Sequence, residues 1–223
     1  IGDNGSLTPL ADSAQPLSNH GVGAAPGPAQ ISFGSDGSTL VVTEKGTNSI
    51  DTYKVEGDIA GAPTTHASSG ATPFGFAFDQ HDHLIVSEAF GGAANASAVS
   101  SYFVHEDEFN TISPSVATTQ TAACWIAISK NGKYAYTTNT GSGSISSYSI
   151  GADGSLTLLN PVAGSTGIGS GPVDMAFSNN GAYLYTLAGG AHTISIFQMS
   201  ADGSLTSQGI ISVPAGVVGL AAQ

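Results

Sequence analysis

Two glutamates stand at equivalent positions in neighbouring copies of a repeated sequence unit. Glu44 and Glu88 each lie seven residues after a tight-turn signal and directly after a short, largely apolar run. If the two carboxylates meet, they could share a proton, which raises the pKa of one of them for work as a general base, or they could coordinate a cation. The competing interpretation is that each carboxylate only accepts hydrogen bonds from amides of the loop that follows. Both interpretations remain open from the sequence, and Glu44 and Glu88 are the candidate catalytic residues.

Five further residues fall where the repeats should present side chains to the same site. Asp174 would add a third acidic group or cap a loop, and Trp125 would form an apolar floor for a ligand or plug the channel. Gln30 occupies the position in its repeat that Trp125 and Asp174 occupy in theirs, and Asn139 occupies the position that Glu44 and Glu88 occupy. His66 lies between two repeats, where it could act as a base or a ligand. These five are the predicted substrate-binding residues.

The elements that position these residues are predicted by an internal repeat. A strand-like motif occurs four times, as Pro28–Phe33, Pro73–Phe78, Ala123–Ile128 and Pro172–Phe177. The last residues of successive motifs are 45, 50 and 49 residues apart. This period is typical of the four-stranded blade of a β-propeller and not of a helical repeat.

Each copy of the motif continues in the same way. A turn follows, with Asp36-Gly37, Asn131-Gly132 and Asn180-Gly181 in three copies and His81-Asp82-His83 in the other. Asn-Gly and Asp-Gly readily adopt the positive φ of a tight hairpin, so the motif strand folds straight back into a second, largely apolar strand. A third strand alternates between apolar and polar residues and carries an aromatic residue in register in every copy. We therefore predict an all-β propeller built from four-stranded antiparallel blades.

The two ends of the chain match parts of blades. Four complete repeats occupy residues 26–71, 72–121, 122–171 and 172–213, whereas residues 1–25 match the outer strand and link of a preceding blade and residues 214–223 match the inner strand of a closing blade. Propellers often close by building one blade from both chain ends. Inner and outer strands of a blade are not neighbours, however. We therefore expect a single propeller domain whose ring is completed by a further segment of a longer chain or by another polypeptide.

The repeat resembles that of the lactonase-like propellers, also called the YVTN family. The resemblance rests on the pattern Pro-x-x-x-x-Phe-x-x-Asp-Gly followed by Asn-Ser-Ile-x-x-Tyr, and it is strongest over Val42–Ile50 and Thr137–Ile145. It implies a ring of seven blades, of which this chain would supply the C-terminal portion. The family includes bacterial 6-phosphogluconolactonases and fungal carboxymuconate-lactonising enzymes, so the resemblance also implies hydrolysis of a cyclic ester.

Composition restricts the partners. The chain has 16 acidic residues and only four basic ones, all lysine, for a formal net charge of -12. Nucleic acids are therefore not expected as partners, because phosphates are bound by Lys and Arg. No apolar run approaches the ~20 residues needed to span a bilayer. Low charge and abundant Ser, Thr and Gly favour secretion over a cytoplasmic location, and no cofactor is expected.

His81 and His83 form a His-x-His pair in the turn that departs from the repeat. An exposed pair of this kind could bind metal adventitiously, but a plain polar turn is the preferred interpretation, and no metal site is predicted.

The sequence thus supports two functions of different classes. The first is a lactonase-like carboxylic ester hydrolase that acts on a small cyclic ester in the central channel, with Glu44 or Glu88 as general base. The alternative is a non-catalytic secreted propeller that binds a partner or assembles into a larger structure.

Overall fold

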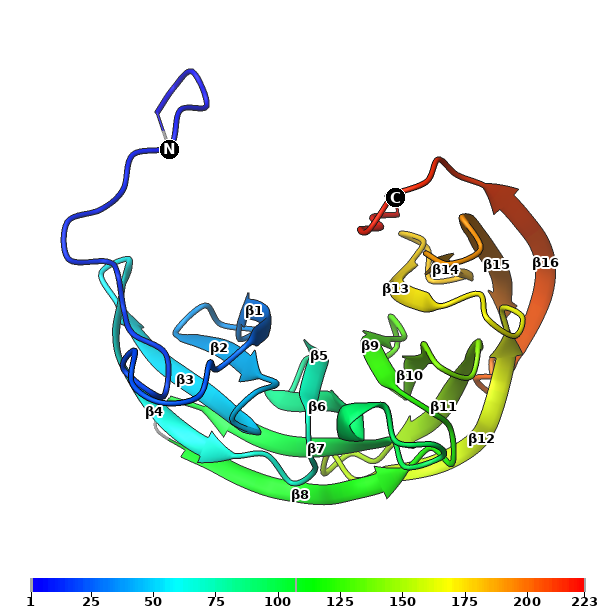
Figure 1. The fold of residues 1–223 in the computed structure, drawn as a ribbon, viewed down its shortest axis with the longest axis horizontal. Helices are drawn as coiled ribbons and strands as arrows, with labels where there is room; N and C mark the ends of the chain where they lie inside the picture. Colours follow the sequence, from blue (N-terminus) through cyan, green and yellow to red (C-terminus); the bar gives the residue numbers. More distant parts are fainter. Residues whose placement is uncertain (1, 107, 223) are drawn as a thin grey trace.

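Four separate β-sheets make up the chain, and all of them are antiparallel. The computed structural model describes residues 2–106 and 108–222. Each sheet contains four strands in sequence order, and the sheets lie side by side along an open arc (Figure 1). This arrangement confirms the predicted propeller fold.

The strands group into four blades. Blade 1 comprises β1 (Pro28–Phe33), β2 (Thr39–Glu44), β3 (Ser49–Glu56) and β4 (Ile59–Ala67). Blade 2 comprises β5 (Pro73–Phe78), β6 (His83–Glu88), β7 (Ala98–His105) and β8 (Glu108–Ala117). Blade 3 comprises β9 (Ala123–Ile128), β10 (Tyr134–Asn139), β11 (Ser144–Ile150) and β12 (Leu156–Ser165). Blade 4 comprises β13 (Pro172–Phe177), β14 (Tyr183–Ala188), β15 (Thr193–Met199) and β16 (Leu205–Ser212). Each blade falls inside one of the four predicted repeats.

The first strand of every blade lies on the inner side of the arc. Figure 1 shows β1, β5, β9 and β13 around the centre and β4, β8, β12 and β16 along the periphery. The tight turn after each inner strand has the expected geometry, because Gly37, Gly132 and Gly181 have φ values of 75°, 70° and 68°. Asp82 takes the same place in blade 2 with a φ of 63°. The repeat therefore brings the start of each first strand and the end of each second strand to the same end of its blade.

The hydrophobic core is divided into three clusters, one between each pair of neighbouring blades. Val41 and Ile50 of blade 1 pack against Phe76 and Tyr102 of blade 2. Corresponding clusters join blades 2 and 3 and blades 3 and 4. Because a buried side chain of this size contributes about 1.5–3 kcal/mol, each blade depends on its neighbours for most of its stability. This explains why the second strands are apolar on both faces.

The two end segments differ from the prediction. Residues 2–27 and 213–222 contain no strand, although strands were expected within 1–25 and 214–223. The two segments lie apart in Figure 1, and neither pairs with a strand of the four described sheets. A sequence that matches a strand stays irregular when its partner strand is not present.

In the part of the chain that the structure describes, helical structure is limited to η1 (Phe90–Gly92), a single 3-10 turn after β6. Among residues 2–106 and 108–222, no helix is long and apolar enough to cross a membrane.

Candidate functional site

Glu44 ends β2 and is completely buried. One carboxylate oxygen accepts a hydrogen bond from the Ser18 amide at 3.0 Å, and the other accepts from the Ser18 and Thr47 hydroxyls, each at 2.5 Å. Burial raises the pKa of Glu44, but these hydrogen bonds outweigh that effect and leave the pKa below its ordinary value. Glu44 is therefore held as a carboxylate.

Asp51 on β3 is the acidic neighbour of Glu44. It is also completely buried, and the Thr65 hydroxyl donates a hydrogen bond of 2.7 Å to it. Burial and the adjacent Glu44 carboxylate raise the pKa of Asp51 to about 6. The acidic neighbour that raises the pKa of Asp51 is thus Glu44 of the same blade, whereas the sequence suggested a pairing of Glu44 with Glu88.

The pair arises from one departure from the repeat. In each blade, the third residue of the third strand faces the end of the second strand. This residue is serine in blades 2, 3 and 4 (Ser100, Ser146 and Ser195). Ser100 donates a hydrogen bond to Glu88 at 2.5 Å, and Asn139 donates one to Ser146 at 2.9 Å. In blade 1 this position is Asp51, so a second carboxylate replaces a hydroxyl donor. The substitution is visible in the sequence, although the serine contact that gives it meaning is not.

Glu88 ends β6 in the equivalent place and is fully satisfied. It accepts hydrogen bonds from the Gly70 amide at 2.8 Å, the Ser100 hydroxyl at 2.5 Å and the Ser115 hydroxyl at 2.6 Å. Its side chain is completely buried, and burial raises its pKa. Glu88 thus serves as a hydrogen-bond acceptor, but its donors are Gly70 before β5, Ser100 on β7 and Ser115 on β8, and not amides of the loop that follows β6 as the alternative interpretation expected.

Gln30 connects two neighbouring blades, and Asp174 connects blade 4 to the C-terminal segment. Gln30 on β1 accepts a hydrogen bond from the Phe76 amide at 2.8 Å and donates one to the Phe76 carbonyl at 2.9 Å. Asp174 on β13 accepts a hydrogen bond from the Leu220 amide at 2.7 Å, and burial raises its pKa. Leu220 therefore takes the place beside blade 4 that Phe76 takes beside blade 1, so the C-terminal segment lies where the next inner strand would begin.

Trp125 on β9 packs against the backbone of Gly75. A Cβ atom at Gly75 would lie 2.8 Å from the Trp125 Cα and 2.5 Å from the Cys124 carbonyl oxygen, so only glycine fits where blades 2 and 3 approach each other. Trp125 is partly exposed on an inner strand, and its role as a ligand floor or a channel plug stays a prediction.

Asn139 is buried at the end of β10, in register with the two glutamates. Its amide nitrogen donates hydrogen bonds to Ser144 and Ser146. Its carbonyl oxygen has no hydrogen-bond partner among the described residues. The register was predicted correctly, but the side chain is enclosed within its blade.

His66 lies away from the inner strands, contrary to its expected place in an inter-blade link. It is part of β4 on the outer side of the arc, where its ring stacks on Phe109 with a centroid separation of 3.9 Å. Its Nε2 lies 3.0 Å from the Thr52 hydroxyl, and burial lowers its pKa. The strand extends further than the sequence pattern indicated, which moves His66 into the packing between blades 1 and 2.

Lys45 is a residue of the inner region that the sequence did not single out. Its ammonium group lies 4.9 Å from the centre of the Phe74 ring on β5, a separation at which a cation and an aromatic face attract each other. Lys45 follows Glu44 directly and thus places a positive charge at the inner end of blade 1.

Comparisons with known proteins agree with this architecture. Residues 3–89 match the family described as lactonase, 7-bladed beta-propeller. A putative 6-phosphogluconolactonase from Bacteroides fragilis is 20% identical, with a TM-score of 0.70 over 86% of this chain and 56% of that one. The periplasmic gluconolactonase of Pseudomonas aeruginosa is 17% identical, with a TM-score of 0.67 over 85% of this chain and 59% of that one. A protein from Lactobacillus plantarum is 16% identical, with a TM-score of 0.76 over 98% of this chain and 65% of that one.

The predicted resemblance to the lactonase-like propellers is thereby confirmed. This chain spans 55 to 65% of the length of the similar structures. Comparison with curated proteins gives no match.

Proposed function

We propose that the chain forms part of a lactonase-like hydrolase that opens a small cyclic ester, with the Glu44–Asp51 pair as its proton-transfer group. The observation that carries the proposal is the family match over residues 3–89, because this stretch contains both carboxylates. The raised pKa of Asp51, about 6, supports the assignment, since a general base works best when its pKa lies near the working pH.

In the proposed reaction, a water oxygen attacks the carbonyl carbon of the ester. The ionised Asp51 carboxylate accepts the proton that the water loses. The bond between the carbonyl carbon and the ring oxygen then breaks, and the departing oxygen takes that proton from Asp51. Burial and the ionised Glu44 beside it keep the pKa of Asp51 raised, and Asp51 returns to its starting state when it gives up the proton.

Substrate access requires one segment to move. Both carboxylates are buried, and Glu44 is covered through Ser18, which belongs to the irregular segment 2–27. Such a segment can detach more readily than a strand that is paired in a sheet. We propose that displacement of residues 16–18 opens the pair to substrate.

The preferred substrate is an uncharged lactone. The chain contains no arginine, which is the side chain best suited to clamp a carboxylate or a phosphate in two places. Lys45, which lies over Phe74, supplies a single positive charge to the inner end of blade 1. This charge favours a developing oxyanion more than a doubly charged substrate group.

The test is a pH-stat assay with uncharged γ- and δ-lactones at pH 5 to 8. We expect activity to rise with pH through about 6, following the pKa of Asp51, and to be lost in Asp51→Asn and Glu44→Gln. Asp51→Ser restores the serine of the other blades and should also be inactive while retaining the fold. Glu88→Gln is the matched control, because Glu88 has the same position in blade 2, and it should keep its activity.

The opposite pattern would reject this assignment. If Glu88→Gln abolishes hydrolysis while Asp51→Ser leaves it unchanged, the proton-transfer group lies in blade 2.

A non-catalytic binding propeller is the second candidate, and the burial of Glu44 and Glu88 favours it. An auxiliary nutrient binding protein from Bacteroides ovatus has a similar fold, with 16% identity and a TM-score of 0.63 over 87% of this chain and 44% of that one. Absence of lactone hydrolysis in the parent protein, together with saturable binding of a small neutral ligand, would support this candidate.

We also propose that further blades cover the ends of the arc. Ile31 on β1 is 62% exposed, whereas the residues in the same register of the other blades, Phe76, Ile126 and Met175, are only 2 to 4% exposed. A preceding blade would bury Ile31 in the same way. Light scattering of the 223-residue chain should show self-association through the exposed ends of the arc. A stable monomer would count against the proposal that further blades cover these ends.

A further inference from the structure

The turn between β5 and β6 differs from the equivalent turn of every other blade. In blades 1, 3 and 4 the turn is organised by the side chain three residues after the end of the inner strand, which is Asp36, Asn131 or Asn180. Blade 2 has His81 there, and its turn is one residue shorter. Asp79 organises this turn instead, since one of its oxygens accepts the amides of His81 at 2.8 Å and His83 at 3.0 Å.

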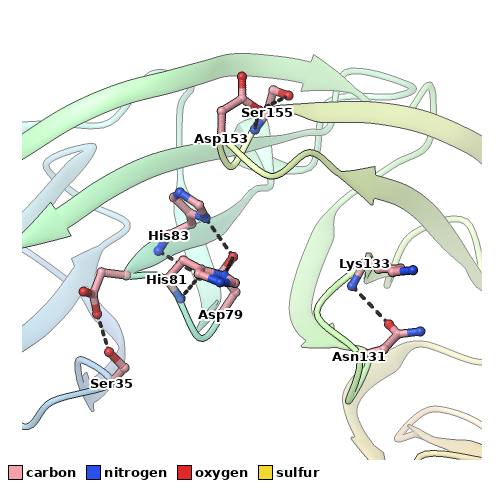
Figure 2. Close-up of polar contacts among 9 residues, drawn as sticks. Ser35, Asp79, His81, His83, Asn131, Lys133, Asp153 and Ser155 are labelled. Atoms are coloured by element: carbon pink, nitrogen blue, oxygen red, sulfur yellow. Dashed lines mark hydrogen bonds and ion pairs between the residues drawn. The ribbon is translucent and has the colours of Figure 1, made fainter.

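This change leaves three potential metal ligands together. The second oxygen of Asp79 lies 2.7 Å from Nδ1 of His83 and 3.9 Å from Nδ1 of His81. One ligand atom from each of the three residues lies within 4.8 Å of the others, and Figure 2 shows the two rings on the same side of the turn as the carboxylate. We propose that Asp79, His81 and His83 bind a divalent transition metal ion such as Zn²⁺.

The ligand types and separations suit such an ion. Two imidazoles and one carboxylate are ligands that Zn²⁺ commonly takes, with bond lengths of about 2.0–2.1 Å. In a tetrahedral site these bonds separate the ligand atoms by about 3.3 Å. The separations of 2.7 and 3.9 Å from the Asp79 oxygen lie on either side of this value, and one ligand atom from each residue lies within 4.8 Å of the others, so rotation of the side chains would bring the three ligands onto one ion.

Two of the ligands are held in place and the third is mobile. The side chains of Asp79 and His83 are 3% and 8% exposed, and the His83 ring packs so closely on Gly154 that a Cβ there would lie 2.6 Å from the ring. The His81 side chain is 75% exposed and has room to turn onto the ion. The expectation of an exposed His-x-His pair was therefore only half right, because His83 is buried beside a carboxylate.

The open side of the site faces a cavity. Asp79 and His81 form part of the wall of a pocket of about 460 Å³, whose opposite wall is formed by residues 131–134 and 149–152 of blade 3. A metal with three protein ligands would keep its remaining positions for water or a ligand in this pocket, as catalytic zinc sites do. Lys133 on the pocket wall would favour an anionic ligand. This site lies at the turn end of the blade, at the opposite end of β6 from Glu88.

The nearby charged groups have other partners. Asp82 interacts with Ser35 and, at 3.2 Å, with His105. Asp153 accepts hydrogen bonds from the amide and hydroxyl of Ser155 (Figure 2). Neither carboxylate therefore competes for the ion, and the three proposed ligands act as a unit.

The test is calorimetric titration of the chelator-treated protein with Zn²⁺, together with metal analysis after dialysis. We expect one ion per chain. Loss of a contact that only orients a metal ligand weakens binding by about 10–100-fold, so removal of a ligand in His81→Ala or Asp79→Asn should weaken it by at least about 10-fold. Asp79→Asn keeps an oxygen acceptor for the turn amides, and His81→Ala changes an exposed side chain, so both variants should fold. His192→Asn is the matched control at an exposed histidine and should bind like the parent.

Two outcomes would overturn the proposal. The first is the absence of stoichiometric binding in the parent. The second is binding that His81→Ala and Asp79→Asn leave unchanged, which would indicate adventitious capture by other surface groups. Thermal unfolding gives an independent readout, since an ion that binds only the folded protein raises the midpoint in the parent and not in the two ligand variants.

Discussion

Replacing Asp51 by asparagine should change how the stability of the fold depends on pH. In the unfolded chain Asp51 ionises near its ordinary pKa of 3.8, whereas in the folded protein its pKa is about 6. Between these values the folded state keeps a proton that the unfolded state has lost. The stabilisation is therefore fully present below pH 3.8 and is lost as the pH rises through about 6.

The size of the effect follows from the difference between the two pKa values. At about 1.4 kcal/mol for each pH unit, the difference amounts to about 3 kcal/mol in full, of which the parent should lose about 2.4 kcal/mol between pH 4 and pH 7 on account of Asp51. The Asp51→Asn variant carries no titrating group there and should not show this loss. The free energy of unfolding of the variant, relative to that of the parent, should thus increase by about 2.4 kcal/mol from pH 4 to pH 7.

Urea denaturation followed by circular dichroism at pH 4, 5, 6 and 7 provides the measurement. Asp58→Asn, on the exposed turn between β3 and β4, makes the same change of charge and controls for the net charge of -12. A difference between Asp51→Asn and parent that stays constant from pH 4 to 7 would refute the argument, because it would mean that Asp51 ionises normally despite burial beside Glu44.

Three further predictions concern the contacts between blades. Gly75→Ala should destabilise the protein by roughly 1–3 kcal/mol in denaturant titration, because the new methyl group would overlap the backbone of Trp125; a neutral result would mean that the two inner strands separate freely. Gln30→Ala removes two hydrogen bonds to the next blade and should cost about 1–2 kcal/mol, with unchanged stability as the contradicting result. Tyr148→Phe removes a hydroxyl that donates to the Val116 carbonyl at 2.9 Å and should cost about 1 kcal/mol, and an increase in stability would show that this hydroxyl is poorly accommodated.

The fold was predictable because its determinants are local and repeated. Turn residues such as Gly37 and Gly132 fix each hairpin by their backbone preference, and four copies of the same pattern confirm one another. The end segments were less predictable for the same physical reason. The sequences of the end segments match strands, but a strand forms only where another strand supplies hydrogen-bond partners. The sequence does not give the positions of those partner strands.

The candidate site was predictable in register but not in contacts. Equivalence of Glu44 and Glu88 follows from the repeat, yet the partner of Glu44 is Asp51 on the adjacent strand of the same blade, because side chains at the end of β2 face the start of β3. Asp79 was missed since its role depends on a turn that is one residue shorter than the others. Comparing each residue with its counterparts in the other repeats identifies both, since Asp51 stands where the other blades have serine and Asp79 stands where they have serine or glycine.

The most direct test of the account is a carbon-13 NMR titration of the Asp51 carboxyl group from pH 4 to 8. We expect the Asp51 carboxyl group to titrate near its folded pKa of about 6. In Glu44→Gln the midpoint of this titration should move towards the ordinary aspartate value, because the neighbouring negative charge is removed. A carboxyl group that is already ionised at pH 4, or a transition that Glu44→Gln leaves unchanged, would contradict the claim that Glu44 and Asp51 form a coupled pair.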